Sequence, residues 1–416
     1  MNRPPARHFM DCGGKGKRGA TPLWPLRYLH PPVHSLSVQN LPVRGGETLP
    51  SITPRFDSKT ASPFATAPRM NPPSFFRHLL VLLWLFFSPA AFGAASTFTN
   101  PIVAGGADPW VVRWHGQYYY CQSGGGHAIW VSRSPKLQDL GRAAARRVWT
   151  PPPRTAYSKE LWAPELHYLR GKWWIYVAAD DGDNAHHRMY VLEGSADDPQ
   201  APFTFKGKIA APTDRWAIDA TVLQMPGDRL YLIWSGWEGA ENVAQHLYIA
   251  PMSNPWTISG ERVRLSSPEL GWEKHGNPLI NEGPEVLWHG DRLFLIYSAS
   301  GSWGDDYCLG QLAWTGGDVL DPKSWLKKPG PVFARTKDVF GPGHCSFVKS
   351  PDGTEDWMVY HSAKFSGAGW NRRVNLQRFT WDTKGSPNFG IPISAGSPCR
   401  FLRKPATVLR RVPIGK

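Results

Sequence analysis

Residues 219–236 read DATVLQMPGDRLYLIWSG, and the same plan recurs at four other places in the chain. Each copy has a short polar opening, a β-type run, a turn that contains glycine, and a second run rich in aromatic and β-branched residues. Glycine supplies the positive φ that a tight hairpin requires, so each copy predicts two antiparallel strands. The other copies are ADPWVVRWHGQYYYCQS (107–123), WAPELHYLRGKWWIYVAA (162–179), EGPEVLWHGDRLFLIYSA (282–299) and GHCSFVKSPDGTEDWMVYHSA (343–363).

The copies recur at a nearly constant interval. Their openings are separated by 54, 57, 63 and 62 residues, and they lie at Asp108, Trp162, Asp219, Glu282 and His344. Further strand-like segments follow within the units, such as HAIWVSRS (127–134) and RMYVLEGS (188–195). About four strands in each of five units predicts an all-β fold, a five-bladed β-propeller. A pair of β-sandwiches would hold as many strands, but it does not explain the regular period.

Composition and charge narrow the class of protein. The 416 residues include 40 Pro and 41 Gly, too many for a coiled coil or a multi-spanning membrane protein. The 21 Trp suit a protein that stacks flat apolar faces, for which sugar rings are one partner. The net charge of +14 does not by itself predict that the protein binds nucleic acid. Half of it comes from residues 1–69, where ten Lys and Arg are scattered among three Asp and Glu.

A secretory signal is predicted inside the chain. From Met70, a short basic region at Arg77 and His78 precedes nine apolar residues (79–87) and then small residues as far as Ala95. This is the layout of a signal peptide over 70–95, and the apolar run is too short to span a bilayer. We therefore expect translation to begin at Met70, with residues 1–69 a non-native or disordered extension, and a secreted or periplasmic protein without stable membrane insertion. The alternative is a core helix of a cytosolic protein.

Four cysteines follow the predicted signal, namely Cys121, Cys308, Cys345 and Cys399. No two of them form a Cys-x-x-Cys pair, which argues against a structural zinc site. Four cysteines allow three disulfide connectivities, and the sequence leaves disulfides and buried free thiols both open.

Three of the five openings carry carboxylates, at Asp108, Asp219 and Glu282. In a propeller the same point of each repeat converges at one end of the central channel. Acidic groups at the start of apolar inner strands are costly to bury, and carboxylates close together shift one another's pKa into acid and base roles. The three residues therefore form a candidate catalytic site; the alternative is a set of hydrogen-bonded carboxylates that close the ends of strands.

The motifs around these residues resemble glycoside hydrolase family 43. They read GGADPW (105–110), AIDAT (217–221) and NEGPEV (281–286), and the likeness covers about residues 98–405. The resemblance implies a five-bladed propeller that cleaves α-L-arabinofuranosyl or β-D-xylosyl linkages with inversion. Asp108 would then be the general base, Asp219 would orient the acid and raise its pKa, and Glu282 would be the general acid. Glu285 is the rival to Glu282 within the same motif.

Other residues are candidates for substrate or cation binding. Trp162, Trp237 and Trp303 lie where aromatic platforms for sugars are expected, with packing in the blades as the alternative. Arg372, in GWNRRVNLQRFTW (369–381), resembles the family's active-site arginine, and Arg373 is its rival. The resemblance also implies a structural calcium or other cation in the central channel, toward which His344 would point; a hydrogen-bonded core histidine is the alternative. Acid–base hydrolysis requires no cofactor.

The resemblance implies a particular activity. We expect residues 96–416 to be a single catalytic domain, a monomer that releases terminal α-L-arabinofuranosyl residues from plant cell-wall arabinan or arabinoxylan. The alternatives are a β-xylosidase or an endo-arabinanase of the same family, or a non-catalytic carbohydrate-binding propeller. The related propellers that cleave fructans and sucrose open with Asn-Asp-Pro, and Ala107 before Asp108 disfavours them.

Overall fold

The computed structural model describes residues 97–401. The predicted extension (1–69) and signal peptide (70–95) lie outside the described residues. The described part consists of β-strands, loops and four short 3-10 helices, so the all-β prediction is confirmed. The helices are η1 (Leu137–Arg142), η2 (Asn184–His186), η3 (Gly271–Glu273) and η4 (Pro322–Ser324). Within residues 97–401, no helix has the length and apolar character needed to cross a membrane.

Three sheets have four strands each, in sequential order. The first consists of β2 (Trp110–Trp114), β3 (Gln117–Ser123), β4 (Ile129–Ser134) and β5 (Ala145–Trp149). The second consists of β6 (Lys159–Leu169), β7 (Lys172–Asp180), β8 (Arg188–Glu193) and β9 (Thr204–Ile209). The third consists of β19 (Phe340–Lys349), β20 (Asp356–Ala363), β21 (Arg372–Trp381) and β22 (Pro387–Asn388).

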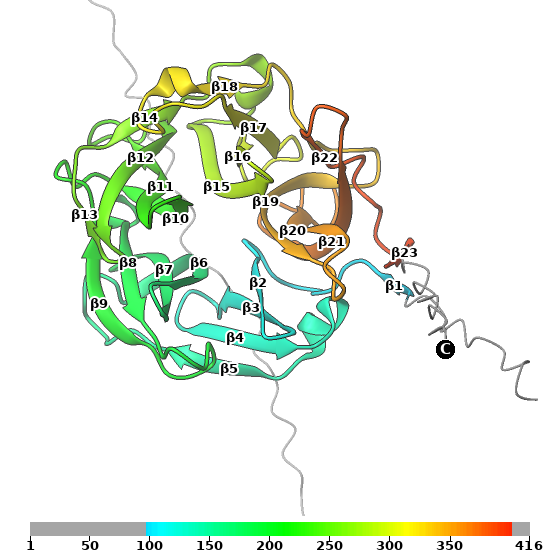
Figure 1. Ribbon diagram of the computed structural model, residues 1–416, viewed down its shortest axis with the longest axis horizontal. Helices are drawn as coiled ribbons and strands as arrows, with labels where there is room; N and C mark the ends of the chain where they lie inside the picture. The colour runs from blue at the N-terminus through cyan, green and yellow to red at the C-terminus, as the bar shows by residue number, and fades with distance from the viewer. Residues whose placement is uncertain (1–96, 402–416) are drawn as a thin grey trace, which may run out of the picture. The chain divides into compact units, whose positions relative to one another are not determined.

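A nine-stranded sheet lies between the second and third of these in the sequence. One part consists of β10 (Ala217–Met225), β11 (Arg229–Trp237), β12 (Ala244–Asn254), β13 (Thr257–Ile258) and β14 (Val263–Ser266). The other consists of β15 (Leu279–His289), β16 (Arg292–Ala299), β17 (Cys308–Trp314) and β18 (Trp325–Lys327). The two parts meet in a short parallel pairing of β12 with β15. The groups of strands form a ring, with β2, β6, β10, β15 and β19 nearest its centre (Figure 1).

The glycine turns form as the repeat predicts. Each central strand pairs antiparallel with the strand that follows it. The glycines of all five turns have φ between 61° and 81°, and they are Gly116, Gly171, Gly227, Gly290 and Gly353. Residues with a Cβ adopt this conformation at a cost, which explains why each repeat keeps glycine at this point.

The core lies between neighbouring groups of strands. Neighbouring residues of β7 illustrate this: Ile175 belongs to the same hydrophobic cluster as Tyr119 of the first sheet, whereas Tyr176 belongs to the cluster that contains Leu232 of β11. Successive side chains of a strand point to opposite faces, so both faces of this sheet are buried. Buried aromatic residues such as Trp173 fill the space between groups. Nine tryptophans of the described residues are buried in this way and serve packing.

The ends of the described chain close the ring. β1 (Thr97–Thr99) pairs with β23 (Pro398–Arg400). The buried side chain of Asn100 donates to the carbonyl of Leu376 and accepts from its N–H, both at 2.8 Å. A bridge between Val103 and Val374 joins the start of the first sheet to β21 of the last. All four cysteines in the described residues are buried free thiols.

Candidate active site

The residues that open the repeats share an unusual backbone conformation. φ is positive at Asp108 (46°), Asp219 (57°) and His344 (44°), and also at Ala163 (41°) and Gly283 (51°). The pairing register of β6, β10, β15 and β19 shifts at this point. Such bulges bend the strand and redirect its side chains, and strained backbone concentrates at functional sites. The positions predicted from the sequence to open the repeats are wrong by one residue in two of the five. By the positive φ, Ala163 rather than Trp162 and Gly283 rather than Glu282 correspond to Asp108.

Asp108 lies among three nitrogen-bearing side chains. Its Oδ1 is 3.2 Å from His361 Nδ1, 3.3 Å from His344 Nδ1 and 3.4 Å from Arg372 Nη1. Burial favours the neutral acid, but these neighbours outweigh it and bring the pKa of Asp108 well below its usual range. Asp108 is therefore ionised at neutral pH.

Of the three side chains around Asp108, Arg372 is the one that carries a positive charge near neutral pH. Burial lowers the pKa of His344 and lowers that of His361 to about 3, so both imidazoles are neutral near pH 7. The guanidinium of Arg372 stays protonated in proteins, and its Nη2 also donates to the carbonyl of Ser302 at 2.7 Å. Its rival Arg373 instead approaches the hydroxyl of Ser362, at 3.4 Å. The contact with Asp108 thus belongs to Arg372.

Asp219 and Glu282 form a coupled acidic pair. Both side chains are buried, and burial followed by the charge of Glu282 raises the pKa of Asp219. Burial also raises the pKa of Glu282 to about 7, and nearby Asp108 adds to that rise. Oδ2 of Asp219 accepts the backbone N–H of Gly283 at 2.9 Å, which favours the ionised form of Asp219. Burial and the repulsion between the two groups therefore let this pair keep a proton at a higher pH than isolated carboxyl groups would.

Glu285 occupies a different environment from Glu282. Its Oε2 is buried without a hydrogen-bond partner among the described residues, and burial raises its pKa well above the usual range. Its electrostatic neighbour is Glu165, which lies 2.8 Å from His167. Arg372 and Asp108 both influence the pKa of Glu282, and neither contributes to that of Glu285. The structure therefore groups Glu282, rather than Glu285, with Asp108.

The predicted tryptophan platforms differ in exposure. Trp162 is half-buried and stacks on His187, with ring centroids 4.0 Å apart. Trp237 is 5% exposed and stacks on Trp216 at 4.8 Å, so it packs inside the protein rather than on its surface. Trp303 is half-buried and meets the exposed Trp370 edge to face, at 6.2 Å.

The surroundings of His344 do not form a cation cage. Among residues 97–401, no group of three or more His, Cys, Asp or Glu side chains is arranged to hold a metal ion. His344 is 7% exposed, and its Nδ1 faces Asp108. A cation held by one imidazole and water molecules stays a prediction, and no catalytic step below passes through a metal.

Two residues of the site were not identified from the sequence. The hydroxyl of Tyr307 donates to Oε1 of Glu282 at 2.9 Å, and Nδ1 of His361 accepts the backbone N–H of Asp108 at 3.1 Å. A signal for His361 was present, because the hairpin of the fifth repeat places it opposite Gly343. Tyr307 lies in the loop before β17, outside the repeated segments, and no pattern marks it.

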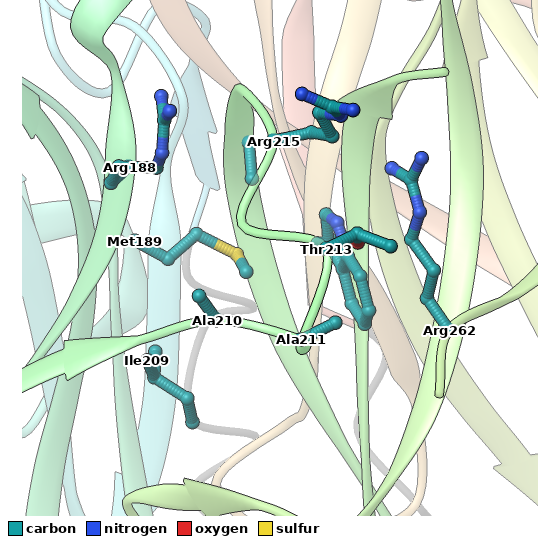
Figure 2. A pocket seen from close by; sticks show the side chains of 10 residues that line it. Arg188, Met189, Ile209, Ala210, Ala211, Thr213, Arg215 and Arg262 are labelled. Carbon is teal, nitrogen blue, oxygen red and sulfur yellow. The ribbon is translucent and has the colours of Figure 1, made fainter. Parts of the chain in front are cut away.

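A separate pocket lies between the second sheet and the part formed by β10–β14 (Figure 2). Its polar lining is basic, with Arg188, Arg215 and Arg262 around apolar side chains. Arg188 pairs with Asp214 at 3.0 Å, and Arg262 donates to the carbonyl of Trp237 at 2.7 Å. No carboxylate lines this pocket, so the chemistry of the acidic site is not located there.

Known proteins resemble this chain over most of the described part. The model of glycosyl hydrolases family 43 matches residues 98–387. An "Extracellular exo-alpha-(1->5)-L-arabinofuranosidase" of Streptomyces avermitilis is 40% identical over 319 residues, which are 73% of this chain and 66% of that protein. "Alpha-L-arabinofuranosidase 43" of Humicola insolens is 36% identical over 315 residues, 73% of this chain and 65% of that protein. The chain thus spans about two thirds of the length of these curated relatives.

A solved structure has the same fold. The α-L-arabinofuranosidase from Lactobacillus brevis superposes with a TM-score of 0.67 at 37% identity, covering 72% of this chain and 98% of that one. The family match extends over well more than half of the chain and includes Asp108, Asp219 and Glu282. The chain therefore belongs to glycosyl hydrolases family 43.

Proposed function

We propose that this protein is an exo-acting α-L-arabinofuranosidase that hydrolyses terminal α-L-arabinofuranosyl linkages with inversion. The observation that carries the proposal is the contrast between two carboxyl groups: Asp108 lies against His344, His361 and Arg372 and is held ionised, whereas Glu282 is buried and has a pKa of about 7. General acid–base hydrolysis requires such a pair of groups. Relatives named as arabinofuranosidases, at 36–40% identity, support the choice of sugar.

The propeller is proposed to have five blades. The three four-stranded sheets supply one blade each. The nine-stranded sheet supplies two, β10–β14 and β15–β18, because β12 and β15 share only two paired positions. Under this count, each blade contributes one central strand, and the catalytic residues come from three different blades.

In the proposed reaction, Asp108 takes a proton from the attacking water as its oxygen bonds to the anomeric carbon. Glu282 gives its proton to the leaving oxygen as the glycosidic bond breaks. Asp219 keeps the proton on Glu282, since a second negative charge beside an ionised carboxylate is unfavourable. Arg372 holds Asp108 ionised and is placed to donate to sugar hydroxyls. Trp162 and Trp303, both half-buried, are the proposed aromatic contacts to the sugar.

The proposal extends to location and partner. Two relatives are named extracellular, which agrees with the predicted signal peptide at residues 70–95 and with a secreted or periplasmic catalytic domain over 96–416. Arabinan and arabinoxylan of plant cell walls are the proposed polysaccharides. A monomer is the proposed state, because one chain supplies all the groups of the site.

Hydrolysis of aryl glycosides tests the proposed function. We expect kcat/KM for an aryl α-L-arabinofuranoside to exceed that for the aryl β-D-xyloside at least about tenfold, because a site that fits a furanose ring binds the transition state of a pyranoside less well. Digestion of linear arabinan should release arabinose alone. Preference for the xyloside would indicate a β-xylosidase, and oligosaccharide products an endo-arabinanase. Binding to arabinan without hydrolysis would indicate a carbohydrate-binding propeller.

A further inference from the structure

Tyr307 contacts the candidate acid from a loop that precedes β17. Its ring is fully buried, and its hydroxyl donates to Oε1 of Glu282 at 2.9 Å. Burial raises the pKa of Tyr307 well above its usual range, so the phenol stays protonated and can act as a donor at any working pH.

The ring of Tyr307 is held on both sides. A Cβ added at Gly343 would lie 2.3 Å from Cε1 of the ring, so only glycine permits this approach. The ring also stacks on His361, with centroids 5.5 Å apart and planes 11° from parallel. His361 accepts the backbone N–H of Asp108. One side chain is therefore in contact with the acid and with the residue that holds the base.

The neighbouring Ser298 explains why the phenol of Tyr307 donates its proton to Glu282 rather than to Ser298. The oxygen of Ser298 already accepts the backbone N–H of His344 at 2.8 Å. The hydroxyl proton of Ser298 can therefore point to the phenol oxygen of Tyr307. A hydrogen bond donated to that oxygen stabilises the phenolate, and the contact with Ser298 does lower the pKa of Tyr307. The phenol proton is then directed to Oε1 of Glu282.

We propose that Tyr307 is a positioning residue for the general acid, whose hydroxyl fixes Oε1 of Glu282 and leaves Oε2 to carry the proton for the leaving group. This inference rests on the proposed function and deepens it. A carboxyl group whose two oxygens have different partners presents its proton in one direction, and proton transfer requires this alignment with the leaving oxygen.

The proposal predicts a change in pH dependence. The titratable and charged groups that influence Glu282 or are influenced by it are Asp219, Asp108, Arg372 and Tyr307, and His344 packs against the neighbouring Gly283. Among them, Tyr307 and Arg372 lower the pKa of Glu282, whereas Asp108 raises it. A general acid acts when it is protonated, so activity falls as the pH rises through its pKa. Without the phenol, that pKa rises and the alkaline limb of the profile moves to higher pH.

Tyr307→Phe tests this while keeping the ring. We expect the alkaline limb of kcat/KM for an aryl α-L-arabinofuranoside to move upward by about one pH unit. Tyr118→Phe is the matched control, because its ring is also buried and its hydroxyl donates to the carbonyl of Lys349 at 2.9 Å rather than to a carboxyl group of the active site. Its limb should coincide with that of the wild type. The limb position does not depend on the amount of folded enzyme, so partial loss of Tyr307→Phe to misfolding leaves the test valid.

A ¹³C NMR titration of the glutamate carboxyl carbons provides a second readout, with Glu282→Gln identifying the signal. It should show the same rise in the Glu282 pKa, even if the wild type hydrolyses no arabinoside and the proposed function fails. Ser298→Ala, which keeps the phenol, should give a smaller shift of the same sign. The proposal would be overturned if Tyr307→Phe changed neither the alkaline limb of kcat/KM nor the titration of Glu282 and lowered kcat equally at every pH. Tyr307 would then serve packing alone.

Discussion

Asp108→Asn is expected to lower kcat/KM for an aryl α-L-arabinofuranoside by about 10²- to 10⁴-fold. An amide has nearly the shape of the carboxylate but cannot take a proton from water. The backbone N–H of residue 108 would still donate to His361, so the local fold should persist. The loss should be similar for good and poor leaving groups, because the base acts on water rather than on the leaving oxygen. Steady-state kinetics over a series of aryl leaving groups measures it.

A matched control is Asp228→Asn, which removes an exposed carboxylate paired with Arg170 on the surface. This variant should keep activity within about twofold of the wild type, since exposed ion pairs contribute little. Activity of Asp108→Asn within a few-fold of the wild type, in protein with a normal melting temperature, would show that Asp108 is not the base.

Glu282→Gln is expected to have an effect that depends on the leaving group. With arabino-oligosaccharides, whose leaving alcohol needs a proton, kcat/KM should fall by about 10²- to 10⁴-fold. With a dinitrophenyl arabinofuranoside the loss should be less than about tenfold, because this phenolate leaves without protonation. Comparison of the two substrates in the same variant separates loss of the acid from general damage to the site.

Glu285→Gln provides the control for this experiment. Glu285 is equally buried, but its electrostatic neighbour is Glu165, not Asp108 or Arg372. Its replacement should lower activity on both substrates by the same factor, if at all. A dependence on the leaving group in Glu285→Gln and none in Glu282→Gln would exchange the two assignments.

The repeated hairpins could be predicted from the sequence because their signals are local. Glycine at positive φ and alternation between two buried faces depend on neighbours in the chain, and the structure has both in every repeat. The three carboxylates could be found for the same reason, since Asp108 and Asp219 open repeats and Glu282 lies one residue before the matching position. The roles within NEGPEV were harder, because the bulge after Glu282 changes which residues share a face.

Other features depend on tertiary contacts that the sequence does not mark. Asp180, at the end of β7, and His187 are fully buried 3.0 Å apart, although no pattern in the sequence marks either residue. Trp237, predicted to be an aromatic platform for sugars, is the last residue of β11 and packs on Trp216. Tyr307 reaches Glu282 only because Gly343, from another strand, leaves space for its ring. Such contacts arise when distant segments fold together, and no periodicity records them.

The stereochemistry of the product tests the central claim most directly. A base acting through water and an acid on the opposite face of the sugar produce inversion, whereas a carboxylate nucleophile produces retention. We would follow the hydrolysis of an aryl α-L-arabinofuranoside by ¹H NMR during the first minutes, before the released sugar equilibrates. Our account predicts that β-L-arabinofuranose appears first and the α anomer later. Initial formation of the α anomer would contradict the assignment of Asp108 as a base that activates water.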